Sequence, residues 1–303
     1  MRAFAWFLLL FAFALAVVAL GTYPAWLLLH PHFDFPFHRI GERLGMVALL
    51  AGFLLIARRL RLADRASLGY GLARRLFVRE MLLGLALGVA TMLAIVGAMS
   101  ALGLLDWSQA RGQGAGAVAQ LLIARLASAL AVAFIEETFL RGALYTAVER
   151  ESGARAAVFL TALLYAATHF FGKVRIAPAD VTPWSGLALL GHSLQAFAHF
   201  GTIADAFLAL LAVGVVLALV RQATGNIAAC LGLHAGWVWV MLVTHELAVP
   251  RRAAPLGFLL SRFDGFVGWL VLAATLLLAL PLWRFYGGRA AATATARRSS
   301  IQL

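Results

Sequence analysis

Long apolar runs, separated by short polar segments, make up most of this chain. Most of the runs are close to the 20 or so residues that an α-helix needs to cross about 30 Å of hydrocarbon. Because every backbone polar group in lipid has to be paired, such runs favour helices over open sheets. The pattern therefore predicts an all-α polytopic membrane bundle of about eight transmembrane helices. We place the spans at residues 4–28, 44–60, 81–105, 117–146, 156–171, 206–220, 227–244 and 265–283.

The segments between the spans differ in composition. Residues 58–79 form a basic connector that holds seven arginines, and residues 106–116 are rich in glycine. Segment 172–205 contains an apolar stretch broken by histidines and a glutamine, which predicts an interfacial or re-entrant helix on the external side. The tail after Trp283 has the composition of a disordered end.

Charge is scarce and unevenly distributed. Hydrophobic residues make up 63% of the chain, charged residues make up 13%, and the mean hydropathy is +0.91. The formal net charge of +12 would suit a nucleic-acid-binding protein, but the arginines gather in polar segments on one side of the predicted spans, above all in 58–79. This asymmetry follows the positive-inside rule and predicts that both termini are cytoplasmic. We expect the lipid bilayer, with its anionic head groups, as a partner, and no nucleic acid.

One segment places two acids inside an apolar run. Residues 134–142 read FIEETFLRG, so Glu136 and Glu137 are adjacent and Arg141 comes four residues after Glu137. Ionised carboxylates are costly in lipid, which makes such a pair a candidate functional site. On a helix Arg141 lies beside Glu137 at a spacing that favours an ion pair, whereas Glu136 points about 100° away. Glu136 is thus the candidate general base, and a purely structural ion pair is the alternative.

Two histidines lie deep in other apolar runs. His169 closes the run FLTALLYAATHFF, with Tyr165 one turn earlier, and His234 lies in IAACLGLHAGWVWVM. A neutral imidazole can act as a base, a hydrogen-bond donor or a metal ligand. A single such histidine is often only a packing residue, but two of them with a glutamate pair could activate water and stabilise an oxyanion. We therefore expect Glu136, His169 and His234 to share one water-accessible cavity.

These residues occur in the order of a known family. The pattern EExxxR, then an aromatic-xxx-His, then a later His on another span resembles the CPBP/CAAX-protease family of intramembrane endopeptidases. The resemblance covers about residues 117–245 and implies a bacterial, glutamate-type intramembrane protease. It implies catalytic roles for Glu136, Glu137, Arg141, His169 and His234, with Tyr165 in the lining of the site.

The third motif departs from the family pattern. The family usually carries HxxxN, whose asparagine helps to bind the oxyanion, but Val238 occupies the position four residues after His234. Valine has no hydrogen-bond donor. We expect Trp237 and Val238 to line the oxyanion and substrate site, with the indole N–H of Trp237 as a candidate replacement donor. The only asparagine, Asn226, lies two turns before His234.

Metal chemistry stays open at this point. Zinc hydrolases often carry HExxH on one helix, and this chain has no such motif. We expect no cofactor, and the alternative is zinc held by Glu136, His169 and His234. Cys230 is the single cysteine, so no intramolecular disulfide is possible, and we expect it to be a small buried residue.

The chain therefore divides into three parts. Residues 1–116 hold the N-terminal membrane helices and the basic loop 58–79, residues 117–245 form the catalytic core implied by the resemblance, and residues 246–303 hold the last membrane helix and the disordered cytoplasmic tail. The expected activity is hydrolysis of peptide bonds in membrane-associated proteins or peptides at the bacterial cytoplasmic membrane. A catalytically silent scaffold or immunity protein of the same fold is one alternative. A proton-coupled transporter is another, although the chain has no evident repeated halves.

Overall fold

The computed structural model describes residues 1–110, 114–171 and 175–299, and these residues are mostly helical. The all-α polytopic fold is confirmed, because seven helical stretches among the described residues are long and apolar enough to cross a membrane. The α-helices are α1 (Arg2–Leu29), α2 (Phe37–Ala57), α3 (Arg74–Ala101), α4 (Ala115–Glu137), α5 (Tyr145–Thr168), α6 (Ser185–Ala198), α7 (Ala204–Thr224), α8 (Ala228–Leu247) and α9 (Trp269–Ser299).

Shorter elements complete the described part of the chain. A π-helical segment, Thr138–Leu144, continues α4 into α5. Two strands of two residues each, β1 (Leu105–Asp106) and β2 (Val249–Pro250), pair antiparallel and join the loop after α3 to the loop after α8. The 3-10 turns are Trp107–Ala110, Pro178–Asp180, Phe200–Thr202 and Gly257–Leu259.

The stretch from α4 to α5 is continuous by hydrogen bonding but reverses direction at Gly153. This residue has φ 82° and ψ 166°, a conformation that glycine adopts without the steric cost of a Cβ. Arg141 and Tyr165 are equally far from Gly153 in the sequence, on opposite sides of it. The Arg141 guanidinium nevertheless lies 4.6 Å from the centroid of the Tyr165 ring, so the chain has folded back on itself. The two arms are therefore antiparallel and correspond to the predicted spans 117–146 and 156–171. With the arms counted separately, the seven stretches become eight spans.

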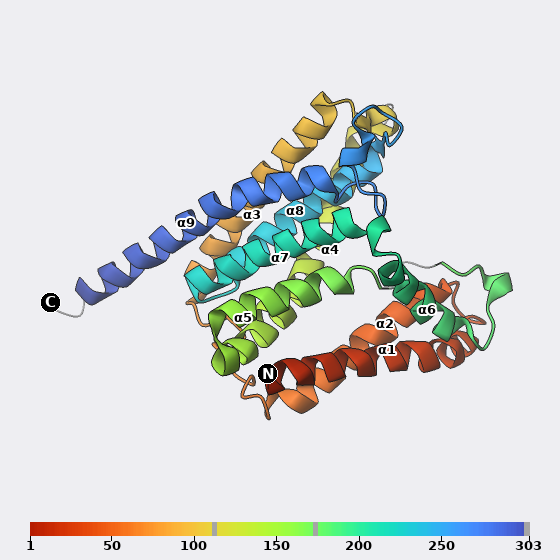
Figure 1. The fold of residues 1–303 in the computed structure, drawn as a ribbon, viewed down its shortest axis with the longest axis horizontal. Helices are drawn as coiled ribbons and strands as arrows, with labels where there is room; N and C mark the ends of the chain where they lie inside the picture. The colour runs from red at the N-terminus through yellow and green to blue at the C-terminus, as the bar shows by residue number, and fades with distance from the viewer. Residues whose placement is uncertain (111–113, 172–174, 300–303) are drawn as a thin grey trace.

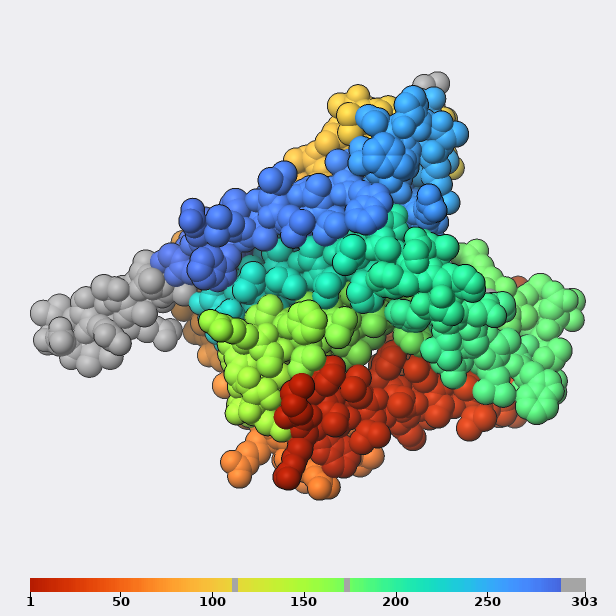
Figure 2. Space-filling view, viewed as in Figure 1, coloured from red at the N-terminus to blue at the C-terminus, as the bar shows by residue number. Residues whose placement is uncertain are grey.

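The helices are arranged in layers (Figure 1). α1 and α2 form a hairpin along one edge, α5 packs against α7 in the middle, and α9 packs on the other side of α7. α8 packs against both α3 and α4. The short α6 lies beside α1, where the sequence predicted an interfacial helix, and in the space-filling view the green surface of α6 and its flanks covers one end of the molecule (Figure 2).

Glycines let α3 and α8 cross at very close range. A Cβ placed on Gly232 would lie 2.0 Å from the carbonyl oxygen of Met81, so no larger residue fits without moving a backbone. Close approach through small residues is how membrane helices pack when the lipid is as apolar as their side chains. Four glycines make this crossing: Gly84 and Gly88 of α3, and Gly232 and Gly236 of α8. Because His234 lies between Gly232 and Gly236, the crossing fixes the position of His234 along the bundle and the direction in which its side chain points.

The basic connector between α2 and α3 packs against the π-helical segment and against the start of α8. The hydroxyl groups of Tyr70 and Thr138 share a hydrogen bond, and the Gly69 carbonyl accepts one from the backbone N–H of Ile227. A Cβ on Gly142 would lie 2.7 Å from the carbonyl oxygen of Leu68, so glycine is needed there as well. The connector therefore contacts two of the three segments that carry the predicted site residues.

The connector is also tied to the tip of the α4–α5 hairpin. Arg150 donates to the Arg61 carbonyl at 2.8 Å and to the Ser67 hydroxyl at 2.7 Å. Ser67 in turn donates to Asp64, and these hydrogen bonds lower the pKa of the Asp64 carboxyl below its usual range. Asp64 therefore stays ionised at neutral pH and holds Ser67 in place.

Two expectations about helix ends are wrong. α2 begins at Phe37 rather than near residue 44, because the charged residues before the apolar run lie at a helix end, where they reach water. The tail after Trp283, expected to be disordered, is helical as far as Ser299. Alanine, the best helix former, recurs in that segment, and Arg289 makes an ion pair with Glu80 of α3 at 2.6 Å. The described residues exclude 300–303 of the predicted tail, 111–113 of the predicted glycine-rich loop and 172–174 of segment 172–205.

Candidate active site

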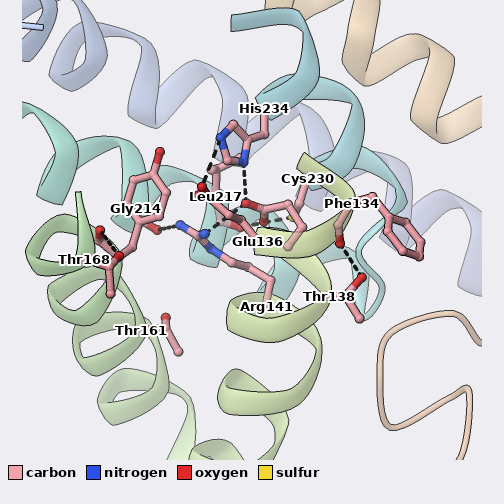
Figure 3. A network of polar contacts seen from close by, with 12 residues as sticks. Phe134, Glu136, Thr138, Arg141, Thr161, Thr168, Gly214, Leu217, Cys230 and His234 are labelled. Atoms are coloured by element: carbon pink, nitrogen blue, oxygen red, sulfur yellow. Dashed lines mark hydrogen bonds and ion pairs between the residues drawn. The ribbon is translucent and has the colours of Figure 1, made fainter. Parts of the chain in front are cut away.

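The predicted site residues come from separate elements, and three of them, Glu136, Arg141 and His234, lie close together inside the bundle (Figure 3). Glu136 and Glu137 end α4, and Arg141 lies in the π-helical segment that follows. His234 projects from the second turn of α8 toward the end of α4. The antiparallel arm α5 brings Tyr165 to the same place, because its ring packs on the Arg141 guanidinium.

Glu137 is the buried centre of a polar network. Its Oε1 accepts a hydrogen bond from Nη1 of Arg141 at 2.9 Å and another from Nδ1 of His234 at 2.8 Å. Glu137 and Arg141 have no exposed surface, and His234 is 2% exposed. A carboxylate at this depth would be very costly without such donors. The hydrogen bond to Glu137 also places the Nδ1 proton of His234, so Nε2 is the nitrogen left for other partners.

Helix α7 holds the π-helical segment from the other side. Nη2 of Arg141 donates to the Gly214 carbonyl at 3.3 Å. Nε of Arg221 donates to the Arg141 carbonyl at 3.0 Å, and its Nη2 donates to the Thr146 hydroxyl at 3.2 Å. A π-helical turn breaks the usual i to i+4 pairing, and such turns often occur at functional sites. Arg221 thus gives the Arg141 carbonyl a side-chain partner.

Sequence reasoning misses both α7 residues. Arg221 directly follows the predicted span 206–220, where an arginine is usually a solvated end residue. In the structure it is 6% exposed and lies over the Tyr145 ring at 5.4 Å. Gly214 carries no signal in the sequence, since it contributes a backbone carbonyl and the space for a neighbouring ring.

Glu136 lies apart from the Glu137 network. Its side chain is 31% exposed, and its Oε2 has no hydrogen-bond partner in the described part of the chain. Nε2 of His234 lies 4.0 Å from this oxygen. The two adjacent glutamates therefore differ completely in their surroundings: one is held by two donors, and the other is available to a small molecule.

A cavity of about 210 Å³ brings the remaining predicted residues together. Glu136, Tyr165, His169 and His234 all line it. The rings of Tyr165 and His234 meet edge to face, with centroids 5.9 Å apart, and Nδ1 of His169 lies 2.8 Å from the Tyr165 carbonyl. The other walls are mainly apolar and come from α3, α7, α8, α9 and residues 263–267. The cavity can therefore hold water beside Glu136 against mainly apolar walls.

Trp237 and Val238 also line this cavity, but Trp237 is not the replacement donor that the sequence suggested. Its indole N–H donates to the Thr91 hydroxyl of α3 at 2.9 Å. The indole has no second N–H, and the side chain of Val238 has no donor. Both residues therefore shape the cavity wall without offering it a hydrogen bond.

Asn226 and Cys230 do not line the cavity. Asn226 lies at the start of α8, where its Oδ1 accepts a hydrogen bond from the N–H of Ala228 at 3.0 Å. The buried thiol of Cys230 points at the Leu217 carbonyl of α7. Within the described ranges, no group of three His, Cys, Asp or Glu side chains could hold a metal ion.

The fold and the site define a class of protein: a polytopic all-α membrane protein in which a buried Glu–Arg–His network borders a cavity with an accessible carboxylate. Residues 118–240 match the family model for type II CAAX prenyl endopeptidase Rce1-like proteins. This segment, which runs from α4 to α8, is therefore similar to the CAAX-protease family, as its motifs predicted. A comparison with curated proteins and a comparison with solved structures each gave no match.

Proposed function

We propose that this protein is an intramembrane endopeptidase that hydrolyses peptide bonds of membrane-associated proteins or peptides, with Glu136 as the general base. The match of residues 118–240 to the family model for type II CAAX prenyl endopeptidase Rce1-like proteins supports a peptidase in general. The observation that carries the assignment to Glu136 is the exposure of its side chain. The Glu136 side chain is 31% exposed and lines the cavity, whereas Glu137 has no exposed surface and is bonded to Arg141 and His234.

The proposed reaction uses one water molecule and one proton shuttle. Glu136 takes a proton from water, and the hydroxide so formed bonds to the scissile carbonyl carbon while the carbonyl oxygen becomes an oxyanion. The carbon–nitrogen bond then breaks, and Glu136 gives its proton to the leaving amine nitrogen. The products are a carboxyl group and an amine, and Glu136 returns to its ionised form.

His234 and His169 assist this reaction. With Nδ1–H bonded to Glu137, Nε2 of His234 faces Glu136 and the cavity. When Nε2 carries a second proton, Nε2–H donates to the oxyanion. His169 lines the same cavity, and we assign it the task of orienting the water for Glu136.

Two other functions make different predictions. A silent scaffold or immunity protein of the same fold would show no cleavage in the wild type. A proton-coupled transporter would move a solute across sealed vesicles, and removal of Glu136 would stop the transport. We favour the peptidase because the accessible carboxylate lies beside a histidine that is oriented by a second carboxylate, an arrangement suited to acid–base chemistry.

We also propose a location. The fold is that of an integral membrane protein, and the arginines of the connector support a cytoplasmic position for both termini, in a bacterial cytoplasmic membrane. Met1 and the far end of α9 lie toward the same end of the bundle (Figure 1). Tags at the two ends that react with impermeant reagents only after the cells are opened would support this orientation. Labelling of either tag in intact cells would contradict it.

The test of the function is a comparison of membranes from cells that express the wild type or Glu136→Gln. Peptides released by the wild type should be missing from the variant, and their uncleaved parent proteins should accumulate. On a purified parent protein the turnover of Glu136→Gln should fall about 10²–10⁴-fold, the usual contribution of a general base. Glu246→Gln is the matched control, because Glu246 lies at the exposed end of α8 in an ion pair with Arg125. Normal cleavage by Glu136→Gln would show that the base is another group.

A further inference from the structure

The cavity has few groups that could donate a hydrogen bond to an oxyanion. The N–H of Trp237 is bonded to Thr91, and Val238 has no donor. Asp264, another lining residue, is an acceptor whose Oδ1 is taken by the backbone N–H groups of Phe266 and Val267. Apart from the two histidines, the donors that remain in the lining are two hydroxyl groups, those of Tyr165 and Thr275.

The Tyr165 hydroxyl combines a place in the cavity lining with the absence of a hydrogen bond in the ranges that the structure describes. The side chain is only 3% exposed, but its hydroxyl oxygen is not fully enclosed as that of Tyr286 is. Buried tyrosine hydroxyls usually find a partner, because an unmet donor in an apolar interior costs free energy. A phenol is protonated at neutral pH, so it is available as a donor. Its position in the cavity lining suggests that the partner is a group of the substrate.

The ring of Tyr165 is held on three sides. The Arg141 guanidinium covers one face at 4.6 Å, the His169 ring lies 4.5 Å away, and the His234 ring lies 5.9 Å away. A Cβ on Gly214 would come within 3.1 Å of the ring, so α7 closes the remaining side. A donor fixed in this way needs no reorganisation during a reaction, which is what makes an oxyanion site effective.

From these contacts we infer that Tyr165 is a catalytic residue whose hydroxyl donates a hydrogen bond to the oxyanion, together with Nε2–H of His234. The inference rests on the proposed endopeptidase function. No proton is transferred from the phenol. Its O–H donates a hydrogen bond while the carbonyl oxygen is negative, and this hydrogen bond is lost when the carbon–nitrogen bond breaks. Tyr165 would thus supply the second donor that neither Val238 nor Trp237 can supply.

The first test is the turnover of Tyr165→Phe on a quenched fluorescent peptide that carries a cleavage sequence identified in the membrane comparison. Loss of one oxyanion donor should lower kcat about 10²–10³-fold and leave KM nearly unchanged. Tyr286→Phe is the matched control, because Tyr286 is a fully buried tyrosine, also without a hydroxyl partner among the described residues, that does not line the cavity. Thr275→Val tests the other hydroxyl. Unchanged kcat in Tyr165→Phe, or a loss of that size in Thr275→Val instead, would overturn the inference.

Rescue separates a catalytic hydroxyl from a structural one. In Tyr165→Phe, the added change Val238→Asn places an amide donor in the lining of the same cavity and should restore turnover by about tenfold or more. A hydroxyl that only supported the fold would not be replaced in this way. Failure of the rescue, combined with a lower melting temperature of Tyr165→Phe, would assign Tyr165 to structure alone.

A binding measurement keeps the inference testable even if the wild type cleaves nothing. The probe is an apolar peptide in which a phosphinate group, with its tetrahedral negative oxygens, replaces one peptide bond. Transition-state mimics of this kind bind more tightly than the parent peptide where oxyanion donors exist. Tyr165→Phe should weaken phosphinate binding about tenfold or more while binding of the parent peptide is unchanged. Equal phosphinate binding by wild type and Tyr165→Phe would overturn the inference, whereas selective binding without turnover would uphold it and reject the endopeptidase function.

Discussion

At the scale of single residues, the structure gives two neighbouring glutamates opposite environments. Glu137 lies against Arg141 and His234 with no exposed surface, and Glu136 opens to a cavity. A separation of one residue is enough to give the two side chains different environments, because successive side chains on a helix point about 100° apart. When His234 is protonated, these four groups carry no net charge together, which suits an apolar interior.

Arg141 should therefore be needed for stability as well as for the site. Arg141→Ala leaves Glu137 as a buried charge with only His234 beside it, and breaking a buried pair in this way costs about 3–5 kcal/mol. We expect a large fall in the midpoint of thermal unfolding in detergent and poor accumulation in cells.

The control for this prediction is Arg125→Ala. The Arg125–Glu246 pair has partly exposed side chains, and such pairs contribute about 0–1 kcal/mol. Each variant removes the arginine of one ion pair. The two ion pairs differ mainly in the burial of their side chains. Equal melting temperatures for the two variants would contradict the assigned role of Arg141.

At the scale of elements, close helix packing places the site. The π-helical segment Thr138–Leu144 is held by α7 on one side and by the basic connector on the other. The crossing of α3 and α8 then sets where His234 meets Glu137. The contact of the connector with Gly142 and the crossing of α3 and α8 are made through glycines and backbone atoms, so both tolerate very little added volume.

Gly232→Ala tests this packing. Its new Cβ would lie 2.0 Å from the Met81 carbonyl and 2.6 Å from the Leu85 backbone nitrogen, so α3 and α8 would have to separate. We expect a loss of stability of about 1–3 kcal/mol from overpacking and a loss of turnover, because His234 moves with α8. The thermal midpoint and the cleavage rate measure the two effects.

Gly97→Ala on α3 is the matched change, because a Cβ there meets nothing within 4 Å. Alanine in a helix is about 0.5–1 kcal/mol more favourable than glycine, so this variant should be as stable as the wild type or slightly more stable. If Gly232→Ala behaved like Gly97→Ala, the close crossing would not be what positions His234.

At the scale of the whole molecule, the cavity collects residues from α3, α4, α5, α7, α8 and α9 around one carboxylate. The proposed reaction needs no metal, because Glu136 activates the water. Purified protein should therefore carry no stoichiometric zinc, and cleavage should survive strong chelation. Elemental analysis and a chelator titration test this directly. About one zinc per chain, lost together with activity in His169→Ala or His234→Ala, would instead support the zinc alternative with Glu136, His169 and His234 as ligands.

The sequence by itself determined the class of fold and the main residues of the candidate site. Apolar runs of membrane-spanning length leave helices as the solution for a backbone in lipid, and the cost of a carboxylate there singled out Glu136 and Glu137. The i, i+4 spacing predicted which of the two pairs with Arg141, and that ion pair is present. These features are local, so chain spacing alone carries them.

Only the tertiary structure decided the rest. Three hydrogen bonds join residues that are far apart in the chain. They link His234 to Glu137, Arg221 to the carbonyl of Arg141, and Trp237 to Thr91. Such contacts depend on how the helices cross, and the crossing is set by small residues whose positions have no chemical signature. The place of the Tyr165 hydroxyl in the cavity lining, without a hydrogen bond among the described residues, is also decided by tertiary structure, since burial and pairing are properties of the packed bundle.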